Sequence, residues 1–349
     1  MSRRLLQAMA GAPQGGAETF FVRLAAALER AGEDQRVLIR RDPARSRHLR
    51  NAGVSVAELA FGGRLDLLTR LRFRRELEQW RPEIVLTWMS RATQFCPAGD
   101  FVHVARLGGY YDLKYYRHCD HLIGNTQAIA SYAIDGGWPD DRVHYLPNFV
   151  PDARLTAVPM SRAELGTPED VPLVVALGRL HRNKGFDLLL EALAVTKDVY
   201  LWLAGDGPLR DALHRLAAEL GVGDRVRFLG WRDEVAGLLA SADFLVSSSR
   251  HEPLGNVVIE AWSAQLPVVA VASDGPAALI EDEVSGLLVP LPGLPGGGAA
   301  GLALAMERVA RDTGLRARLA AAGRRAYETQ FTEDIVVARY RRLFDEVAR

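Results

Sequence analysis

The chain has 349 residues, of which 48% are hydrophobic and 25% are charged, a composition that excludes a disordered protein. It is long enough for two domains with full hydrophobic cores. Basic and acidic residues number 43 each, and this neutral balance, with no recognition motif, argues against nucleic-acid binding. No apolar run approaches the roughly 20 residues of a membrane-spanning helix.

The charge is unevenly distributed along the chain. Residues 1–150 hold 21 basic and 16 acidic side chains, whereas residues 151–349 hold 22 and 27. The excess indicates a basic surface on the first half, although scattered solvated charges would give the same count. Cys96 and Cys119 form no metal or redox motif, which indicates a reducing compartment. We therefore expect a cytoplasmic protein without a secretory signal, and leave open peripheral contact at the inner membrane face.

The chain begins with the pattern of one strand and one helix. Residues 5–9 predict a buried strand, residues 11–16 a glycine loop and residues 17–31 a helix with apolar side chains at helical spacing. Gly15 and Gly16 end the loop, where their backbone amides would face a phosphate, but such a pair is also an ordinary turn. The order GAPQGG lacks G-x-G-x-x-G, which excludes a dinucleotide-dependent dehydrogenase.

Short strands and helices then alternate, which predicts a parallel sheet. The predicted strands are 37–39, 54–59 and 84–87, with helices at 46–52 and 65–80. Within the last helix, residues 64–75 (RLDLLTRLRFRR) are both apolar and basic. This segment is either a surface helix with solvated arginines or a face for an anionic membrane or acceptor.

Residues 88–118 carry few periodic signals and many aromatic side chains. His103 and Asp112 are the candidates here for a group that reaches the reacting carbon of a substrate, with Arg106 nearby. The histidine and the tyrosines could equally be packing residues. Beyond them the pattern predicts a strand at 122–123, a helix capped by Thr126 and a strand at 143–146, and a linker is expected within 148–170.

A second βα series starts at residues 173–177, followed by GRLHRNKG. Arg179 and Lys184 in this segment would lie at the carboxyl edge of a sheet, where open α/β folds bind ligands. Arginine offers a fork and lysine a point charge to phosphate oxygens, so the pair predicts a phosphate site. Further strands are predicted at 199–204 and at 226–229, the latter ending in Gly230-Trp231.

The most informative stretch is 244–272, which predicts a strand, a polar loop, a helix over 255–264 and a strand at 268–271. The unpaired amides and positive dipole at the helix start favour a diphosphate. Glu260 lies about 6 Å further along the axis, so its carboxylate could accept from ribose hydroxyls, while Glu252 faces the group beyond the phosphates. The residues that open the helix are Leu254, Gly255, Asn256 and Val257. Two solvated glutamates eight residues apart also occur by chance.

These motifs resemble those of retaining family 4 nucleotide-sugar glycosyltransferases, which have the GT-B fold and include members of lipopolysaccharide and polysaccharide biosynthesis. The resemblance rests on Glu252 and Glu260 (E-x7-E), on GR…KG at 178–185 and on GGAE at 15–18. It is weak in 88–118, which lacks a clear His-Asp pair. It is also incomplete at 290–300, where the family often has an aspartate.

The resemblance implies an α/β protein with two Rossmann-like parallel-sheet domains facing across a cleft. Residues 1–150 would form the acceptor domain and residues 151–330 the nucleotide-sugar domain, with helix 332–348 packing back on the first. It also implies that Glu252 holds sugar hydroxyls, that Glu260 binds ribose and that an apolar wall near Trp231 seats the base. Further helices are expected near 301–311 and 313–328.

The expected reaction is retaining transfer from a nucleotide-diphosphate sugar to a hydroxyl of a glycan or lipid-linked acceptor. No D-x-D motif occurs in the sequence, so we expect no metal and no cofactor other than the nucleotide-sugar substrate. Arg179, Lys184 and the helix start at Gly255 would then balance the diphosphate charge. The alternatives are a nucleotide-sugar 2-epimerase on the same fold and a non-catalytic nucleotide-sugar-binding subunit.

Overall fold

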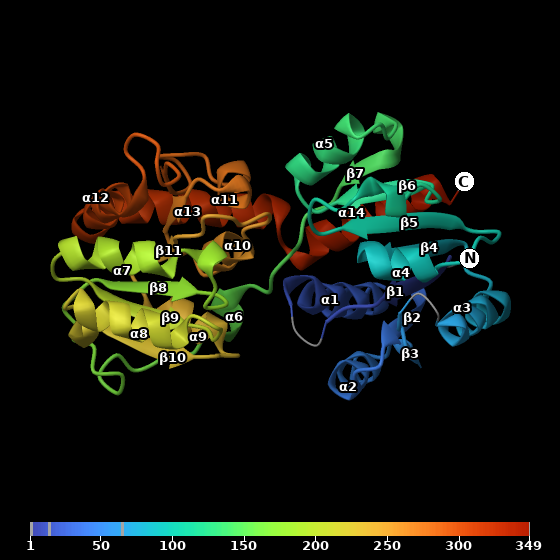
Figure 1. Cartoon of the computed structure of the whole chain (residues 1–349), viewed down its shortest axis with the longest axis horizontal. Coiled ribbons are helices and arrows are strands. Elements are labelled where there is room, and N and C mark those ends of the chain that lie inside the picture. The colour runs from blue at the N-terminus through green and yellow to red at the C-terminus, as the bar shows by residue number, and fades with distance from the viewer. Residues whose placement is uncertain (1–2, 13–14, 64–65, 349) are drawn as a thin grey trace. The chain divides into compact units, whose positions relative to one another are not determined.

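The computed structural model describes residues 3–12, 15–63 and 66–348, which form two compact units (Figure 1). The first unit runs up to Phe149 and resumes at Glu333, and the second is Val150–Thr332. The domain boundaries expected from the sequence, at 150 and 330, lie within two residues of these positions. Each unit is built on one parallel sheet, as the alternation of strands and helices predicts.

The described part of the first unit contains a seven-stranded sheet in the order β3-β2-β1-β4-β5-β6-β7. All of its pairs are parallel. The strands are β1 (Arg4–Met9), β2 (Asp34–Arg40), β3 (Ser55–Leu59), β4 (Ile84–Trp88), β5 (Val102–Leu107), β6 (His121–Gly124) and β7 (Val143–Tyr145).

Helices cover both faces of this sheet. They are α1 (Gly16–Arg30), α2 (Pro43–Asn51), α3 (Leu67–Trp80), α4 (Met89–Phe95), α5 (Gln127–Asp135) and α14 (Glu333–Val347). Successive strand residues point to opposite faces. Leu5 accordingly joins a core with α1 and α14, whereas Leu6 joins a core with α3 and α4.

The C-terminal helix α14 belongs to the first unit by its packing. Tyr340 and Phe344 are fully buried in the same core as Phe20 of α1. Two ion pairs add to this contact, Arg30–Glu333 at 2.5 Å and Arg341–Glu33 at 2.8 Å. The helix expected at 332–348 therefore completes one face of the first sheet.

The second unit contains a six-stranded parallel sheet, counted over its described residues, in the order β10-β9-β8-β11-β12-β13. Its strands are β8 (Leu173–Leu177), β9 (Tyr200–Ala204), β10 (Val226–Gly230), β11 (Phe244–Ser247), β12 (Val268–Val271) and β13 (Leu287–Val289). The helices are α6 (Ala153–Thr156), α7 (Phe186–Val195), α8 (Arg210–Glu219), α9 (Val235–Ser241), α10 (Asn256–Ser263), α11 (Asp274–Leu279), α12 (Gly298–Arg311) and α13 (Thr313–Gln330). Separate hydrophobic cores lie on its two faces.

The segment 148–170, expected to be a linker, makes tertiary contacts with β9 and α9 of the second unit. The Trp202 indole donates to Thr167 Oγ1 at 2.9 Å, and the Met160 amide donates to Ser241 Oγ at 2.7 Å. Such tertiary contacts are invisible in a stretch whose composition is that of a loop. Only its start, beside Phe149, lies at the boundary between the units.

Candidate active site

Loops after four neighbouring strands meet at the carboxyl edge of the second sheet. The Gly178 amide donates to the Ala204 carbonyl at 3.0 Å, and the Gly205 amide donates to the Gly230 carbonyl at 2.8 Å. These bonds join the ends of β8, β9 and β10. The Ser248 hydroxyl after β11 donates to the Lys184 carbonyl at 2.9 Å. Open α/β sheets bind ligands at this edge, and the residues predicted to bind phosphate accordingly lie in one cluster.

Glycine is required where these loops touch. A Cβ on Gly205 would lie 1.8 Å from the Gly178 carbonyl oxygen, and one on Gly185 would lie 2.1 Å from the Ser248 carbonyl oxygen. Both residues also have positive φ, at 149° and 62°. The GR…KG segment can therefore approach the end of β11 only because its last residue has no side chain.

Lys184 and Glu252 form the central pair of this edge. The Lys184 ammonium donates to Glu252 Oε2, and their side chains are 22% and 13% exposed. Glu252 Oε1 also accepts from the Gly255 amide at 3.3 Å, so the carboxylate lies at the start of α10. Lys184, predicted to bind phosphate, thus contacts Glu252, predicted to bind the sugar. A diphosphate at the same helix end would compete with Glu252 for both donors.

Arg179 differs from Arg250, another arginine near this edge. Its side chain is exposed, and within the described part of the chain its guanidinium has no hydrogen-bond or ion-pair partner. Arg250 instead forms two bonds to Asp187, at 2.6 and 2.7 Å. Burial alone would raise the Asp187 pKa, but hydrogen bonding and attraction to Arg250 lower it overall. The Arg250 guanidinium is therefore paired within the fold, whereas the Arg179 guanidinium is free to bind a ligand.

The other residues of the second unit that are predicted to bind the sugar donor lie at the same edge. Gly255 caps α10 with φ 77°, and the half-buried Leu254, Asn256 and Val257 flank it. Glu260 is half-buried in the second turn of α10. Trp231 directly follows β10, is 60% exposed and donates from its indole to Asp233 at 3.0 Å. The structure thus brings the predicted residues of 179–260 to one sheet edge.

In the first unit, Gly15 and Gly16 are exposed at the start of α1, as expected; residues 13 and 14 of the loop lie outside the described residues. Glu18 was missed. Its buried carboxylate accepts from the Ala12 amide at 2.7 Å, and a Cβ on Gly15 would lie 2.3 Å from Glu18 Oε2. A negative group therefore already lies at this helix start. A glutamate at the third helical position, which commonly folds back on the N-terminus, was the available signal.

Arg106, near the end of β5, is held entirely by the first unit. It is 2% exposed and lies between the rings of Phe20 and Trp88, at 4.8 and 4.7 Å. Its guanidinium donates to Tyr340 Oη at 2.9 Å and to Asn148 Oδ1. This arrangement joins α1, β4, β5 and α14 and leaves the cation no access to solvent.

His103 was a candidate catalytic residue, but the structure places it in the amino-terminal half of β5, 4% exposed and away from the carboxyl edge of its sheet. Its Nε2 shares a hydrogen bond with Thr87 Oγ1 at 2.9 Å, and burial lowers its pKa to about 3. His103, His118 and Cys119 have ligand-type atoms within 4.8 Å of one another. His118 also bonds the Thr93 carbonyl at 3.1 Å, so both rings have partners without an ion.

Asp112, the other candidate of this region, lies beyond β5 and is exposed. It accepts from the Lys114 amide at 3.0 Å and pairs with the Lys114 ammonium at 2.5 Å. These hydrogen bonds lower its pKa. Asp112 lines a cavity of about 680 Å³ with Tyr110, Arg117 and Tyr132. The lining of this cavity, unlike the buried His103, is thus an exposed polar surface beyond the strand ends of the first sheet.

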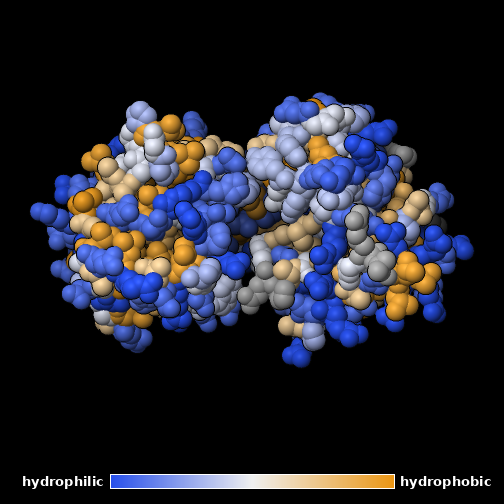
Figure 2. Space-filling model, in the orientation of Figure 1, coloured by the Kyte–Doolittle hydropathy of each residue, from blue (hydrophilic) through white to orange (hydrophobic). Residues whose placement is uncertain are grey.

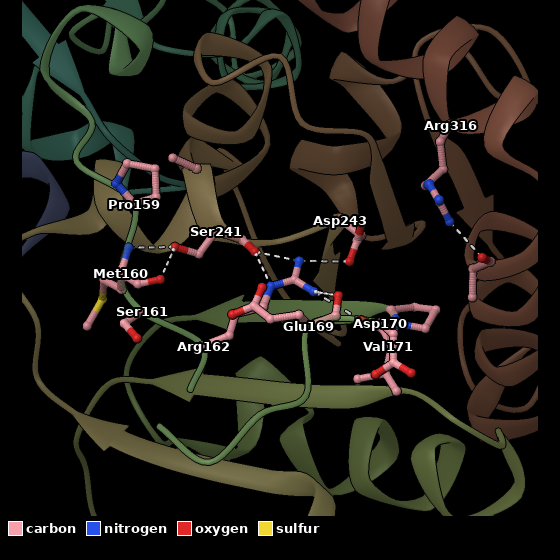
Figure 3. Close-up of a pocket in the computed structure, with 13 residues that line it drawn as sticks. Pro159, Met160, Ser161, Arg162, Glu169, Asp170, Val171, Ser241, Asp243 and Arg316 are labelled. Atoms are coloured by element: carbon pink, nitrogen blue, oxygen red, sulfur yellow. Dashed lines mark hydrogen bonds and ion pairs between the residues drawn. The ribbon is translucent and has the colours of Figure 1, made fainter. Parts of the chain in front are cut away.

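A second cavity, of about 630 Å³, lies beside the amino-terminal ends of β8 and β11 (Figure 3). Arg162 crosses it and donates to the Ser241 carbonyl at 3.0 and 2.7 Å, to the Val171 carbonyl at 3.0 Å and to Asp243 at 3.0 Å. This cation is fully used in fixing the segment before β8. Because ligands of open α/β sheets bind at the opposite edge, we assign this cavity no part in catalysis.

Two Rossmann-like parallel sheets, one in each unit, with cations and a helix start at the carboxyl edge of the second, define a protein of the GT-B fold class. The chain matches the family model "Glycosyltransferase Family 4" over residues 14–154 and "Glycosyl transferases group 1" over residues 158–326. It is 40% identical to LpsE and 39% identical to LpsD of Rhizobium meliloti, with 94% and 95% of this chain and 95% of each relative covered. Both relatives are lipopolysaccharide core biosynthesis glycosyltransferases. The chain therefore belongs to the group 1 glycosyltransferases of family 4 and is a glycosyltransferase.

Solved structures agree on the fold. HepE of Anabaena, in complex with UDP and glucose, superposes with a TM-score of 0.82 at 23% identity and covers 99% of this chain and 100% of its own. A glycosyltransferase of Rickettsia africae reaches a TM-score of 0.87 at 16% identity, with coverage of 100% and 99%. At these identities the likeness establishes the GT-B fold alone.

Proposed function

We propose that this glycosyltransferase moves a sugar, with retention at the anomeric carbon, from a nucleotide-diphosphate sugar to a hydroxyl of a lipid-linked glycan in lipopolysaccharide core synthesis. The observation that carries the proposal is the cluster of Lys184, Glu252 and the α10 start at one sheet edge. The names of the two relatives that match over nearly the whole chain support the pathway.

In this proposal each group of the edge has one task. Negative charge develops on the leaving diphosphate, and Lys184, Arg179 and the first amides of α10 stabilise it. Glu252, displaced from the Gly255 amide by the phosphates, accepts from hydroxyls of the donor sugar. Glu260 accepts from the ribose, and the exposed Trp231 borders the base. We assign Asp112, in the first unit, to acceptor binding.

We propose further that the reaction needs neither metal nor cofactor. Two side-chain cations and a helix start supply the positive charge that a divalent ion supplies elsewhere. We place the enzyme in the cytoplasm, peripheral to the inner membrane face, because its proposed acceptor is lipid-linked. No helix in the described ranges is long and apolar enough to cross a membrane.

The test has two stages. A thermal-shift screen of nucleotide sugars identifies the donor, starting with UDP sugars because HepE was solved with UDP-glucose; a ligand at 100 times its Kd should stabilise by about 2.7 kcal/mol. The selected donor is then incubated with and without a lipopolysaccharide core acceptor. We expect an α-linked product from an α-linked donor. Epimerised donor without acceptor would identify a 2-epimerase, and inversion would refute the retaining mechanism.

A further inference from the structure

The solvent face of α3 is unusually apolar. Leu67, Leu68 and Leu71 are 67%, 68% and 62% exposed, and Figure 2 shows a hydrophobic patch over this helix. These leucines are not needed for the core of the first unit. Thr69, Phe73 and Leu77, spaced four residues apart, form the buried stripe of α3.

Arginines border the leucines on the same exposed side. At 100° per residue, Leu68, Leu71 and Arg75 share one stripe, while Arg72 and Arg74 lie on its two sides. All three arginines are exposed. From Leu67 to Arg75 the helix contains no acidic residue. The first acid, Glu76, is half-buried and pairs with Arg36 at 2.7 Å.

We infer that this α3 face (Leu67, Leu68, Leu71, Arg72, Arg74 and Arg75) docks the enzyme on a membrane surface that contains anionic lipids. The leucines would enter the boundary between headgroups and acyl chains, and the guanidinium groups would pair with lipid phosphates. The inference deepens the proposed function and rests on it for the lipid-linked acceptor.

Charge argues against a second copy of the chain as the occupant. A two-fold dimer through the α3 face would bring together two copies of the same patch, both bordered by arginines. Glu78, near the end of α3, is the one exposed carboxylate of this helix that each copy could set against the three arginines of this face. An anionic lipid surface satisfies the leucines and the arginines together.

The test is flotation of the full-length enzyme with phosphatidylcholine vesicles containing or lacking phosphatidylglycerol. The parent should float with the anionic vesicles, and less so at high salt. Leu68→Ser with Leu71→Ser should reduce the bound fraction at least tenfold. The control is Leu304→Ser in α12, because Leu304 is 66% exposed and outside this face; its binding should equal that of the parent.

A second pair of variants tests the charges. Arg72→Gln with Arg74→Gln should remove most of the preference for anionic vesicles, whereas Arg311→Gln, at a side chain 74% exposed on α12, should keep it. Unchanged circular dichroism and an unchanged thermal shift with nucleoside diphosphate should accompany every variant. That shift tests the donor site, so its failure in the parent would refute the proposed function and not the docking.

Any one of four results would overturn the docking inference. The parent could fail to float with anionic vesicles, the leucine variants could float as the parent does, or Leu304→Ser could lose as much binding as Leu68→Ser with Leu71→Ser. A dimer in solution that the leucine substitutions dissociate would assign the face to a second copy and overturn it as well.

Discussion

Each parallel sheet has an arginine at its carboxyl end, and the two arginines have opposite surroundings. Arg106, the fifth of six residues in β5, lies between two aromatic rings and donates to Tyr340 and Asn148. Arg179, two residues beyond β8, is exposed and has no partner within the described residues. A cation that is buried and fully paired, as Arg106 is, gives no evidence for ligand binding at its sheet edge.

The carboxylates at the helix starts of the two edges also differ in their partners. At α1 the buried Glu18 carboxylate accepts from the Ala12 amide without any cation on its oxygens among the described residues. At α10 the Glu252 carboxylate forms an ion pair with the Lys184 ammonium. In our proposal a diphosphate at the second edge replaces the Glu252 carboxylate as the partner of Lys184. The first edge holds a fixed negative group that disfavours a diphosphate.

The largest expected effect is on stability, from Arg106→Ala. The substitution removes the guanidinium that donates to Tyr340 and Asn148 and empties the space between Phe20 and Trp88, so we expect the free energy of unfolding to fall by about 3 kcal/mol or more. Thermal unfolding with near-UV circular dichroism measures it. Arg179→Ala is the matched control and should stay within about 0.5 kcal/mol of the parent. Equal losses would remove the distinction between the two arginines.

Local motifs explain what the sequence could predict. Arg179, Lys184, Glu252 and Glu260 each lie within a few residues of a predicted strand end or in the helix that follows one, and the parallel-sheet rule then places them together. The direct bond between Lys184 and Glu252 joins residues 68 apart, and no local pattern indicates it.

The first unit was harder to predict around β5 for a physical reason. His103 and Arg106 interrupt the apolar run of this strand, so no strand was expected within 88–118 and the end at which His103 lies could not be assigned. Both are buried by partners distant in sequence; Arg106 and Tyr340 are 234 residues apart. Only the tertiary structure shows that such polar side chains belong to the core.

The next largest effect separates the two acids of the second edge. Glu252→Ala should lower turnover by about 10- to 100-fold, since hydrogen bonds to charged groups contribute about 1.5–3 kcal/mol. Its affinity for nucleoside diphosphate should stay equal or rise, because Lys184 loses a competing carboxylate. Glu260→Ala should weaken nucleoside and donor together. Steady-state kinetics and calorimetry measure both, and the reverse pattern would mean that the motif faces the other way.

The smallest expected effect is that of chelation. Because Arg179, Lys184 and the α10 start balance the diphosphate charge in our account, turnover in excess EDTA should equal turnover without it. Activity assays before and after dialysis against EDTA check this, with added Mg²⁺ as the control. Loss on chelation that Mg²⁺ or Mn²⁺ restores would refute the metal-independent mechanism.

The central claim is that the carboxyl edge of the second sheet binds the diphosphate of the donor. Calorimetric titration of nucleoside diphosphate into the parent, Lys184→Ala and Arg179→Ala tests it most directly, with the free nucleoside as the control ligand. We predict that each substitution weakens diphosphate binding about 10- to 100-fold and leaves nucleoside binding nearly unchanged. Diphosphate affinities equal to that of the parent in both variants would contradict the account.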